Sequence, residues 1–332
     1  YPQAMKDYNK ALELREDHLQ ALSRRGNLKG KLQDQEGAIS DLTKSIDIFE
    51  KDLFYLQRGV FKSELNDYTG AIADYSKAIQ INPKNALAYN KRGHAKDKLE
   101  KYDQALKDYT KSIELEPEHL YTNFNRGLCF FKTQKYKEAI SDFTIATIRN
   151  PNNTDAYAYR GTAKEALQDY KGALEDYSKA FELTNDHSFA ISKRAALKNN
   201  LKDYRGAITD YTIAIKMLEH DIFHLQRGAL KIKVKDYQGA VEDYSIAIDL
   251  YPENVTPYNR RGYAKNELKK YKEAIADFTK AIELKPDFDL AYFNRGITKQ
   301  NLEDLEGACI DWEIAAKLGL KKALKQLENQ CL

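Results

Sequence analysis

An arginine–glycine dipeptide returns along the chain at an almost constant interval, and this interval limits the folds that the sequence can adopt. Eight copies are present, Arg194-Ala195 takes the place of a ninth, and successive copies are 33 or 34 residues apart. We call the second residue of each dipeptide the anchor: Gly26, Gly59, Gly93, Gly127, Gly161, Ala195, Gly228, Gly262 and Gly296. Twelve residues after every anchor stands an alanine, and fifteen after it an aspartate. A period near 34 predicts a solenoid of stacked units, which also explains how 332 residues avoid the size limit of a single core.

Each unit is predicted to hold two helices. In residues 86–119 the first is expected from Ala86 to Leu99 and the second from Tyr102 to Leu115, with Pro117 ending it. Apolar residues of the second helix recur at the spacing of one buried stripe. A glycine inside a helix costs about 1 kcal/mol relative to alanine. Its recurrence opposite the repeated alanine therefore predicts two helix backbones in close approach.

These residues resemble the tetratricopeptide repeat, with an aromatic residue, a small anchor, an alanine, a second aromatic residue and a closing proline. The resemblance implies an all-α, right-handed superhelical solenoid of antiparallel helix pairs with a C-terminal capping helix. It divides the chain into a partial repeat at 1–18, of which only the second helix is present, nine tandem repeats at 19–322 and the capping helix at 323–332. Twenty helices are expected. Because the chain opens in the middle of a repeat, we expect its true N-terminus to be missing.

Two positions depart from the family pattern. Arginine precedes the anchor in all nine repeats, and lysine stands three residues after it in eight of the nine. The aspartate fifteen residues after the anchor is the natural partner of these cations. We therefore predict a repeated Arg–Asp pair between helices, either within a repeat or across two repeats.

A second periodicity lies above the first. The segment from Asp52 to Gly59 returns as Asp221 to Gly228, at an offset of 169 residues or five repeats. Asn90, Lys91 and Asn125 return in the same way as Asn259, Arg260 and Asn294. Duplication of a five-repeat block and selection for equivalent faces both explain the pattern.

The resemblance implies that the first helices line a concave groove, through residues six and three before and one and four after the anchor. Around Gly127 these residues are apolar, which indicates either a docking patch or packing that replaces a lysine lost at Phe130. The polar candidates are groove amides and cations, or ordinary solvated surface. The candidate groove residues are Tyr121, Phe124, Leu128, Phe131, Asn90, Lys91, His94, Asn125, Asn259, Arg260 and Asn294.

Catalytic and metal chemistry have little support in the sequence. There is no glycine-rich phosphate loop, no serine elbow and no cysteine pair at ligand spacing. The six histidines are expected at the surface or in helix caps, and Cys309 is expected in the core. We predict no catalytic residues, no cofactor and no metal.

The sequence favours a protein-interaction scaffold that binds an extended peptide or helix of a partner in the groove. The alternatives are an RNA-binding helical repeat, which a net charge of +3 disfavours, and a regulatory repeat domain of a larger enzyme. No apolar run is long enough to span a membrane. A cytoplasmic location is the default expectation, and the partner and the oligomeric state are left open.

Overall fold

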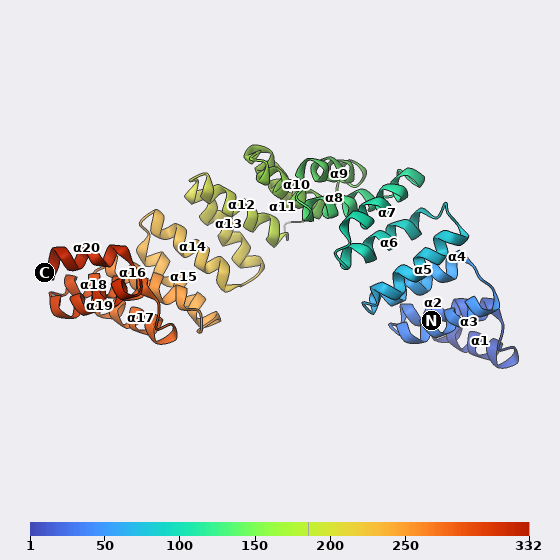
Figure 1. Ribbon diagram of the computed structural model, residues 1–332, viewed down its shortest axis with the longest axis horizontal. Coiled ribbons are helices and arrows are strands. Elements are labelled where there is room, and N and C mark those ends of the chain that lie inside the picture. Colours follow the sequence, from blue (N-terminus) through green and yellow to red (C-terminus); the bar gives the residue numbers. More distant parts are fainter. Residues whose placement is uncertain (185, 332) are drawn as a thin grey trace. The chain divides into compact units, whose positions relative to one another are not determined.

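The computed structural model describes residues 1–184 and 186–331, and this part of the chain forms twenty α-helices and no strands (Figure 1). In chain order the helices are α1 (Pro2–Leu14), α2 (Leu19–Lys31), α3 (Gln35–Ile48), α4 (Asp52–Glu64), α5 (Tyr68–Ile81), α6 (Ala86–Lys98), α7 (Tyr102–Leu115), α8 (Thr122–Lys132), α9 (Tyr136–Arg149), α10 (Thr154–Ala166), α11 (Tyr170–Thr184), α12 (Ser188–Asn200), α13 (Tyr204–Met217), α14 (Asp221–Lys233), α15 (Tyr237–Leu250), α16 (Val255–Glu267), α17 (Tyr271–Leu284), α18 (Asp289–Asn301), α19 (Leu305–Lys317) and α20 (Lys321–Gln330). The predicted all-α architecture of paired helices is confirmed.

The turn inside each repeat has one conformation throughout. Nine residues, each seven positions after an anchor, adopt a left-handed backbone, and none of them is glycine. At Glu100, with φ of 58°, the next backbone N–H, from Lys101, donates to the carbonyl of Lys96 at 2.9 Å. This hydrogen bond satisfies a carbonyl that the end of the first helix leaves without a partner. The second helix then starts two residues after Glu100.

Six of the anchor glycines make room for an aromatic ring. A Cβ added at Gly59 would lie 2.6 Å from the ring of Tyr75, and one at Gly262 would lie 2.8 Å from the ring of Phe278. The ring belongs to the residue after the repeated aspartate, so at these anchors the nearest neighbour is a side chain. The backbone of the repeated alanine, which the sequence had suggested as the neighbour, lies close to Gly26 and Gly93, where the carbonyl oxygens of Ala38 and Ala105 would be 3.2 and 3.3 Å from an added Cβ. Where the anchor is Ala195, the matching Tyr211 is 5% exposed, whereas Tyr75 is 1% exposed.

The chain divides into two compact units, unit 1 (Tyr1–Ala173) and unit 2 (Leu174–Leu332), and each is described by itself. Consecutive helices pack against one another from α1 to α10 in unit 1 and from α12 to α20 in unit 2. First helices of neighbouring repeats also touch: α2 with α4, α4 with α6, α6 with α8 and α8 with α10 in unit 1, and α14 with α16 and α16 with α18 in unit 2. These helices therefore form a continuous surface, which we call the first-helix face of each unit.

The C-terminal helix closes unit 2 and corrects one expectation. Ala323 and Leu327 of α20 pack on Trp312 of α19, as a capping helix should. Cys309 is not a core residue, because it forms a disulfide with Cys331 across a Cα–Cα distance of 6.0 Å. It occupies a half-buried position that faces the following helix, and here that helix is α20. The division into domains at residues 18 and 322 stays a prediction, and residues 185 and 332 lie outside the described residues.

The histidines mostly follow the expectation. His18, His187 and His220 accept hydrogen bonds from backbone N–H groups at the starts of α2, α12 and α14, respectively. His224 is an exception, since it is only 2% exposed. His224 lies four residues before the anchor, as Tyr55 and Tyr258 do in their repeats, and all three side chains are buried. The expectation of a surface or capping role is wrong for His224.

Candidate functional site

The predicted Arg–Asp pair is confirmed in eight repeats and lies within each repeat. In each of them the arginine donates from Nε and Nη2 to both carboxylate oxygens, at 2.5–3.0 Å. The pairs are Arg25–Asp41, Arg58–Asp74, Arg92–Asp108, Arg126–Asp142, Arg194–Asp210, Arg227–Asp243, Arg261–Asp277 and Arg295–Asp311. Lysine three residues after the anchor approaches the same carboxylate within 2.7–3.0 Å in seven of these repeats.

The same arginines also join neighbouring repeats, which the sequence reasoning missed. From Arg58 onward, Nη1 donates to a hydroxyl on the second helix of the preceding repeat, at 2.9–3.3 Å. The hydroxyl always lies two residues after the aspartate. A signal was present, because serine or threonine fills this position in eight of nine repeats. The ninth has Glu313, and no arginine-bearing repeat follows it.

The burial of these side chains indicates that the Arg–Asp network has a structural role. The eight aspartate side chains are 1–7% exposed, and their arginines are 15–20% exposed. Burial alone raises the pKa of Asp243, but hydrogen bonds from Arg227 and Lys231 outweigh it and hold the pKa below its usual value. A network that recurs in so many repeats holds the solenoid together rather than marking one binding site.

A polar pocket lies on the first-helix face of unit 2. Asn259 and Arg260 of α16 and Asn294 of α18, all predicted groove residues, line one cavity of about 260 Å³. The remaining lining residues are Ala229, Ile232, Lys233, Tyr244 and Tyr263. Three of the sequence-predicted residues are therefore brought together, across two neighbouring repeats.

The hydrogen bonds in this pocket leave polar groups available. The Nδ2 group of Asn294 donates to Oδ1 of Asn259 at 3.0 Å. This bond uses one end of each amide and leaves an Asn259 donor and the Asn294 acceptor without a partner among the described residues. Burial raises the pKa of Tyr244, and the neighbouring Arg260 opposes that rise. Tyr244 therefore keeps its proton near neutral pH.

The counterpart residues in unit 1 are bonded differently. Asn90 is 4% exposed and donates from Nδ2 to Oγ1 of Thr122 at 2.9 Å. Its neighbours on the chain, Lys91 and His94, are half-buried, as is Asn125. Burial, followed by the charge of Lys98, lowers the pKa of His94, so its ring is neutral at pH 7.

The apolar candidates near Gly127 separate into two groups. Phe124 and Phe131 both pack edge-on against Tyr159, at centroid distances of 6.2 and 5.8 Å. Leu128 is half-buried on the same helix. Tyr121 is 56% exposed and precedes the start of α8 rather than lying on it, contrary to the expected helix face.

The late start of α8 has a local cause. Its neighbours α6 and α10 start after Asn85 and Asn153, whose side chains accept a hydrogen bond from the first helical turn. In α8 the same place is taken by His119, whose Nδ1 atom lies 2.8 Å from Oγ1 of Thr122. His119 therefore binds a side-chain hydroxyl instead of a backbone N–H of the first helical turn, and α8 begins later than its neighbours.

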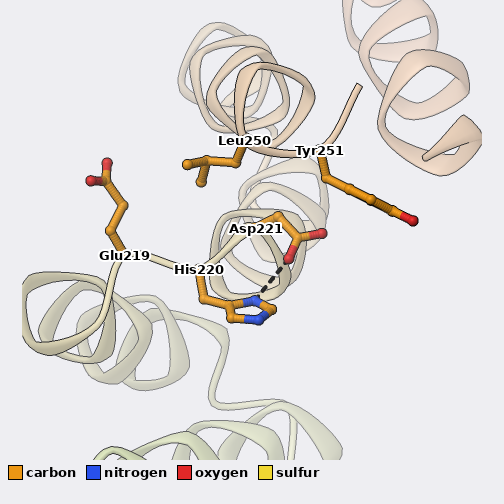
Figure 2. A pocket seen from close by; sticks show the side chains of 5 residues that line it. All are labelled: Glu219, His220, Asp221, Leu250 and Tyr251. Carbon is orange, nitrogen blue, oxygen red and sulfur yellow. Dashed lines mark ion pairs between the residues drawn. The ribbon is translucent and has the colours of Figure 1, made fainter. Parts of the chain in front are cut away.

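A larger cavity, of about 440 Å³, lies where α13 meets α14 and α15 meets α16 (Figure 2). In it the His220 Nδ1 atom lies 2.8 Å from Oδ1 of Asp221. Figure 2 shows the His220 ring turned toward this carboxylate, while Glu219 and Tyr251 extend away from each other. The polar groups therefore do not converge on one point, and this junction is a weaker candidate than the pocket of unit 2.

Two kinds of site are absent from the described residues. No group of three or more His, Cys, Asp or Glu side chains is arranged to hold a metal ion. None of the described helices has both the length and the apolar character that a membrane crossing requires.

Comparison with known proteins agrees with the fold. Models of the tetratricopeptide repeat match residues 86–119, 132–187 and 256–288, a model described as TPR repeat matches residues 63–99, and one described as SHNi-TPR matches residues 1–22. No curated protein matches the chain.

Several solved structures share the architecture. A tetratricopeptide repeat protein from Parabacteroides merdae is 20% identical over 77% of this chain and 98% of its own, with a TM-score of 0.52. PilF of Pseudomonas aeruginosa is 18% identical over 62% of this chain and 94% of its own, with a TM-score of 0.54. YrrB, described as a TPR protein with an unusual peptide-binding site, is 20% identical over 56% of this chain and 97% of its own, with a TM-score of 0.51. With the repeat models and the helix pairs described above, these matches show that the chain belongs to the tetratricopeptide-repeat family, with about nine and a half tandem repeats.

Proposed function

We propose that this protein is a non-catalytic interaction scaffold that binds an extended peptide of a partner protein on the first-helix face. The pocket of unit 2, around Asn259, Arg260 and Asn294, is the contact that carries the proposal. Its amides and its cation come from two neighbouring first helices and open into one cavity.

The chemistry of the pocket suits an extended backbone. A peptide strand that is not paired in a sheet presents N–H donors and C=O acceptors, each of which needs a partner. The amide donor left on Asn259 and the acceptor left on Asn294 supply one of each. Arg260 is exposed and adds a charge-assisted bond for a carboxylate. Tyr263 and Ile232 offer apolar surface beside these polar groups.

The size of the pocket argues for a chain segment. Small-molecule sites usually enclose about 300–1,000 Å³, and this cavity holds about 260 Å³. A single side chain of a longer ligand fits that space, with the rest of the ligand lying along the face. YrrB, a solved structure of the same fold, is also described as having an unusual peptide-binding site.

The test begins with random 12-residue peptides displayed on phage and selected on the full chain. A photo-reactive benzoyl-phenylalanine then replaces Tyr263, and capture of the selected peptide is measured with and without Arg260→Glu. Lys272→Glu is the matched control, because it makes the same charge change on an exposed residue of α17. We expect capture to fall at least about tenfold with Arg260→Glu and to persist with Lys272→Glu.

Two results would contradict the proposal. One is a selection that yields no binding peptide, and the other is capture that Arg260→Glu leaves unchanged. If the chain retains RNA instead, with affinity that falls steeply as salt rises, the RNA-binding alternative is supported.

A further inference from the structure

The residues at two successive positions of the first helix follow the same order through four repeats of each unit. We number positions from the anchor, so −3 and −2 lie three and two residues before it. In four consecutive repeats of unit 1 these positions hold Ser23-Arg24, Leu56-Gln57, Asn90-Lys91 and Phe124-Asn125. In unit 2 they hold Ser192-Lys193, Leu225-Gln226, Asn259-Arg260 and Phe293-Asn294. Six of the eight positions are identical, and the other two exchange arginine and lysine.

Three other positions of the same helices have diverged. At −6, +1 and +4, none of the twelve matching positions is identical between the units. His94 matches Tyr263, for example, and Asp97 matches Asn266. Descent from a duplicated block would by itself leave similarity at all of these positions. The retention at −3 and −2 therefore needs a cause of its own.

Packing accounts for position −3 but not for position −2. Leu56 and Leu225 are both buried, and the hydroxyls of Ser23 and Ser192 both donate to the carbonyl three residues earlier. The side chains at −2 are exposed or half-buried in every one of the eight repeats. No packing requirement fixes the order cation, glutamine, cation, asparagine at a surface position.

The cations at −2 lack carboxylate partners. In the described residues, Arg24, Lys91, Lys193 and Arg260 have no carboxylate oxygen within 4.0 Å. The arginines at −1, in contrast, are held by aspartates in eight repeats. Each unit thus carries on its first helices two cations without a carboxylate partner, with a glutamine between them and an asparagine after them.

The spacing of these charges describes the ligand. Packed helices lie about 8–10 Å apart, so cations two repeats apart are separated by about 16–20 Å. An extended chain rises about 3.3 Å per residue, and this distance corresponds to about five or six residues. An extended segment with two acidic groups at that spacing is complementary to the face.

We propose that unit 1 and unit 2 carry corresponding cationic sites and that the protein binds two copies of one class of acidic extended segment, one on each unit. This inference rests on the proposed function and adds the number of sites and the charge pattern of the ligand. Lys91 in unit 1 and Arg260 in unit 2 are the matching residues that each contact an acidic group.

The experiment is a calorimetric titration of the full chain with the selected 12-residue peptide that carries acidic residues five or six positions apart. We expect two peptides per chain for the wild type, one for Lys91→Glu, one for Arg260→Glu and none for the double variant. Lys107→Glu on α7 and Lys272→Glu on α17 are exposed, charge-matched controls and should keep two. Circular dichroism confirms that each variant retains its helix content.

The outcomes separate this inference from the proposed function. A wild-type stoichiometry of one that Arg260→Glu abolishes and Lys91→Glu leaves intact overturns the two-site inference and leaves the proposed function standing. A stoichiometry that neither variant changes overturns both. A selected peptide without acidic residues overturns the charge pattern proposed for the ligand.

Discussion

Removing one aspartate of the repeated ion pair should destabilise the solenoid more than removing the whole pair. Asp142 is the best test because its side chain is 2% exposed, while Arg126 retains 20% exposure. Arg126 donates to it at 2.7 and 2.8 Å, and Asn123 adds a third hydrogen bond at 3.0 Å. In Asp142→Ala the guanidinium keeps the hydrogen bond to the hydroxyl of Thr110 and its position over the Phe130 ring, whose centroid is 5.8 Å away.

The expected magnitude follows from the burial of the charge. Breaking a fully buried pair from one side costs about 3–5 kcal/mol. Because Arg126 is one-fifth exposed, we expect about 3 kcal/mol for Asp142→Ala, at the lower end of that range. Replacing both residues by leucine removes the uncompensated charge and restores apolar contact. Both variants leave the donor of Asn123 without Asp142, so that cost cancels in the comparison.

The assay is urea unfolding of both variants and the wild type, followed by circular dichroism at 222 nm. The double variant Arg126→Leu/Asp142→Leu should recover about 1–2 kcal/mol of the loss in Asp142→Ala. Equal midpoints for the single and double variants would refute the reasoning, and so would a double variant less stable than the single one. Arg126→Leu and Asp142→Leu, each made alone, complete the double-mutant cycle.

Three further predictions concern other contacts. Thr279→Val removes the hydroxyl that Arg295 Nη1 contacts at 2.9 Å, and we expect a loss of about 1 kcal/mol in urea unfolding. Cys331→Ser opens a disulfide whose partners are 22 residues apart, and it should destabilise the attachment of α20 by up to about 3 kcal/mol, measured as faster amide exchange in that helix. The folded pKa of Asp243 lies below its ordinary 3.8, so its stabilising contribution is complete above that value and is lost as pH falls through the folded pKa. The melting temperature should therefore decline below about pH 4, and less steeply in a variant with Asp243→Asn.

The repeat architecture could be predicted from the sequence because each repeat contacts only its neighbouring repeats. Local signals then fix local structure. The second helix of the repeat at residues 86–119 was predicted from Tyr102 to Leu115, and these are the bounds of α7. The Arg–Asp pair followed from two residue types at a fixed separation. Whether it lay within or across repeats depended on side-chain direction, which spacing alone does not supply.

Features that break the repeat were less accessible. Cys309 shares a register with half-buried isoleucines such as Ile72, and only the approach of α20 shows that it reaches Cys331. Tyr121 was placed on a helix face because the periodicity continues through it. The exchange of an asparagine cap for His119 shortens α8, and that effect depends on which hydrogen bond the histidine makes.

The candidate site was predictable in part. Asn259, Arg260 and Asn294 were identified from the periodicity of five repeats, and they line one pocket. Their unit 1 counterparts share the residue types but not the hydrogen bonds, since Asn90 is buried against Thr122. The burial and hydrogen bonding of an amide depend on the neighbouring helix. The periodicity of five repeats alone therefore did not reveal that Asn90 and Asn259 are bonded differently.

The most direct test of the central claim compares two charge-matched double variants in binding the selected acidic peptide. Lys91→Glu/Arg260→Glu reverses one cation on the first-helix face of each unit, and Lys107→Glu/Lys272→Glu makes the same total charge change on second helices. The account predicts that the first pair abolishes peptide binding and that the second leaves it within about twofold of the wild type. Equal binding by the two double variants would contradict it.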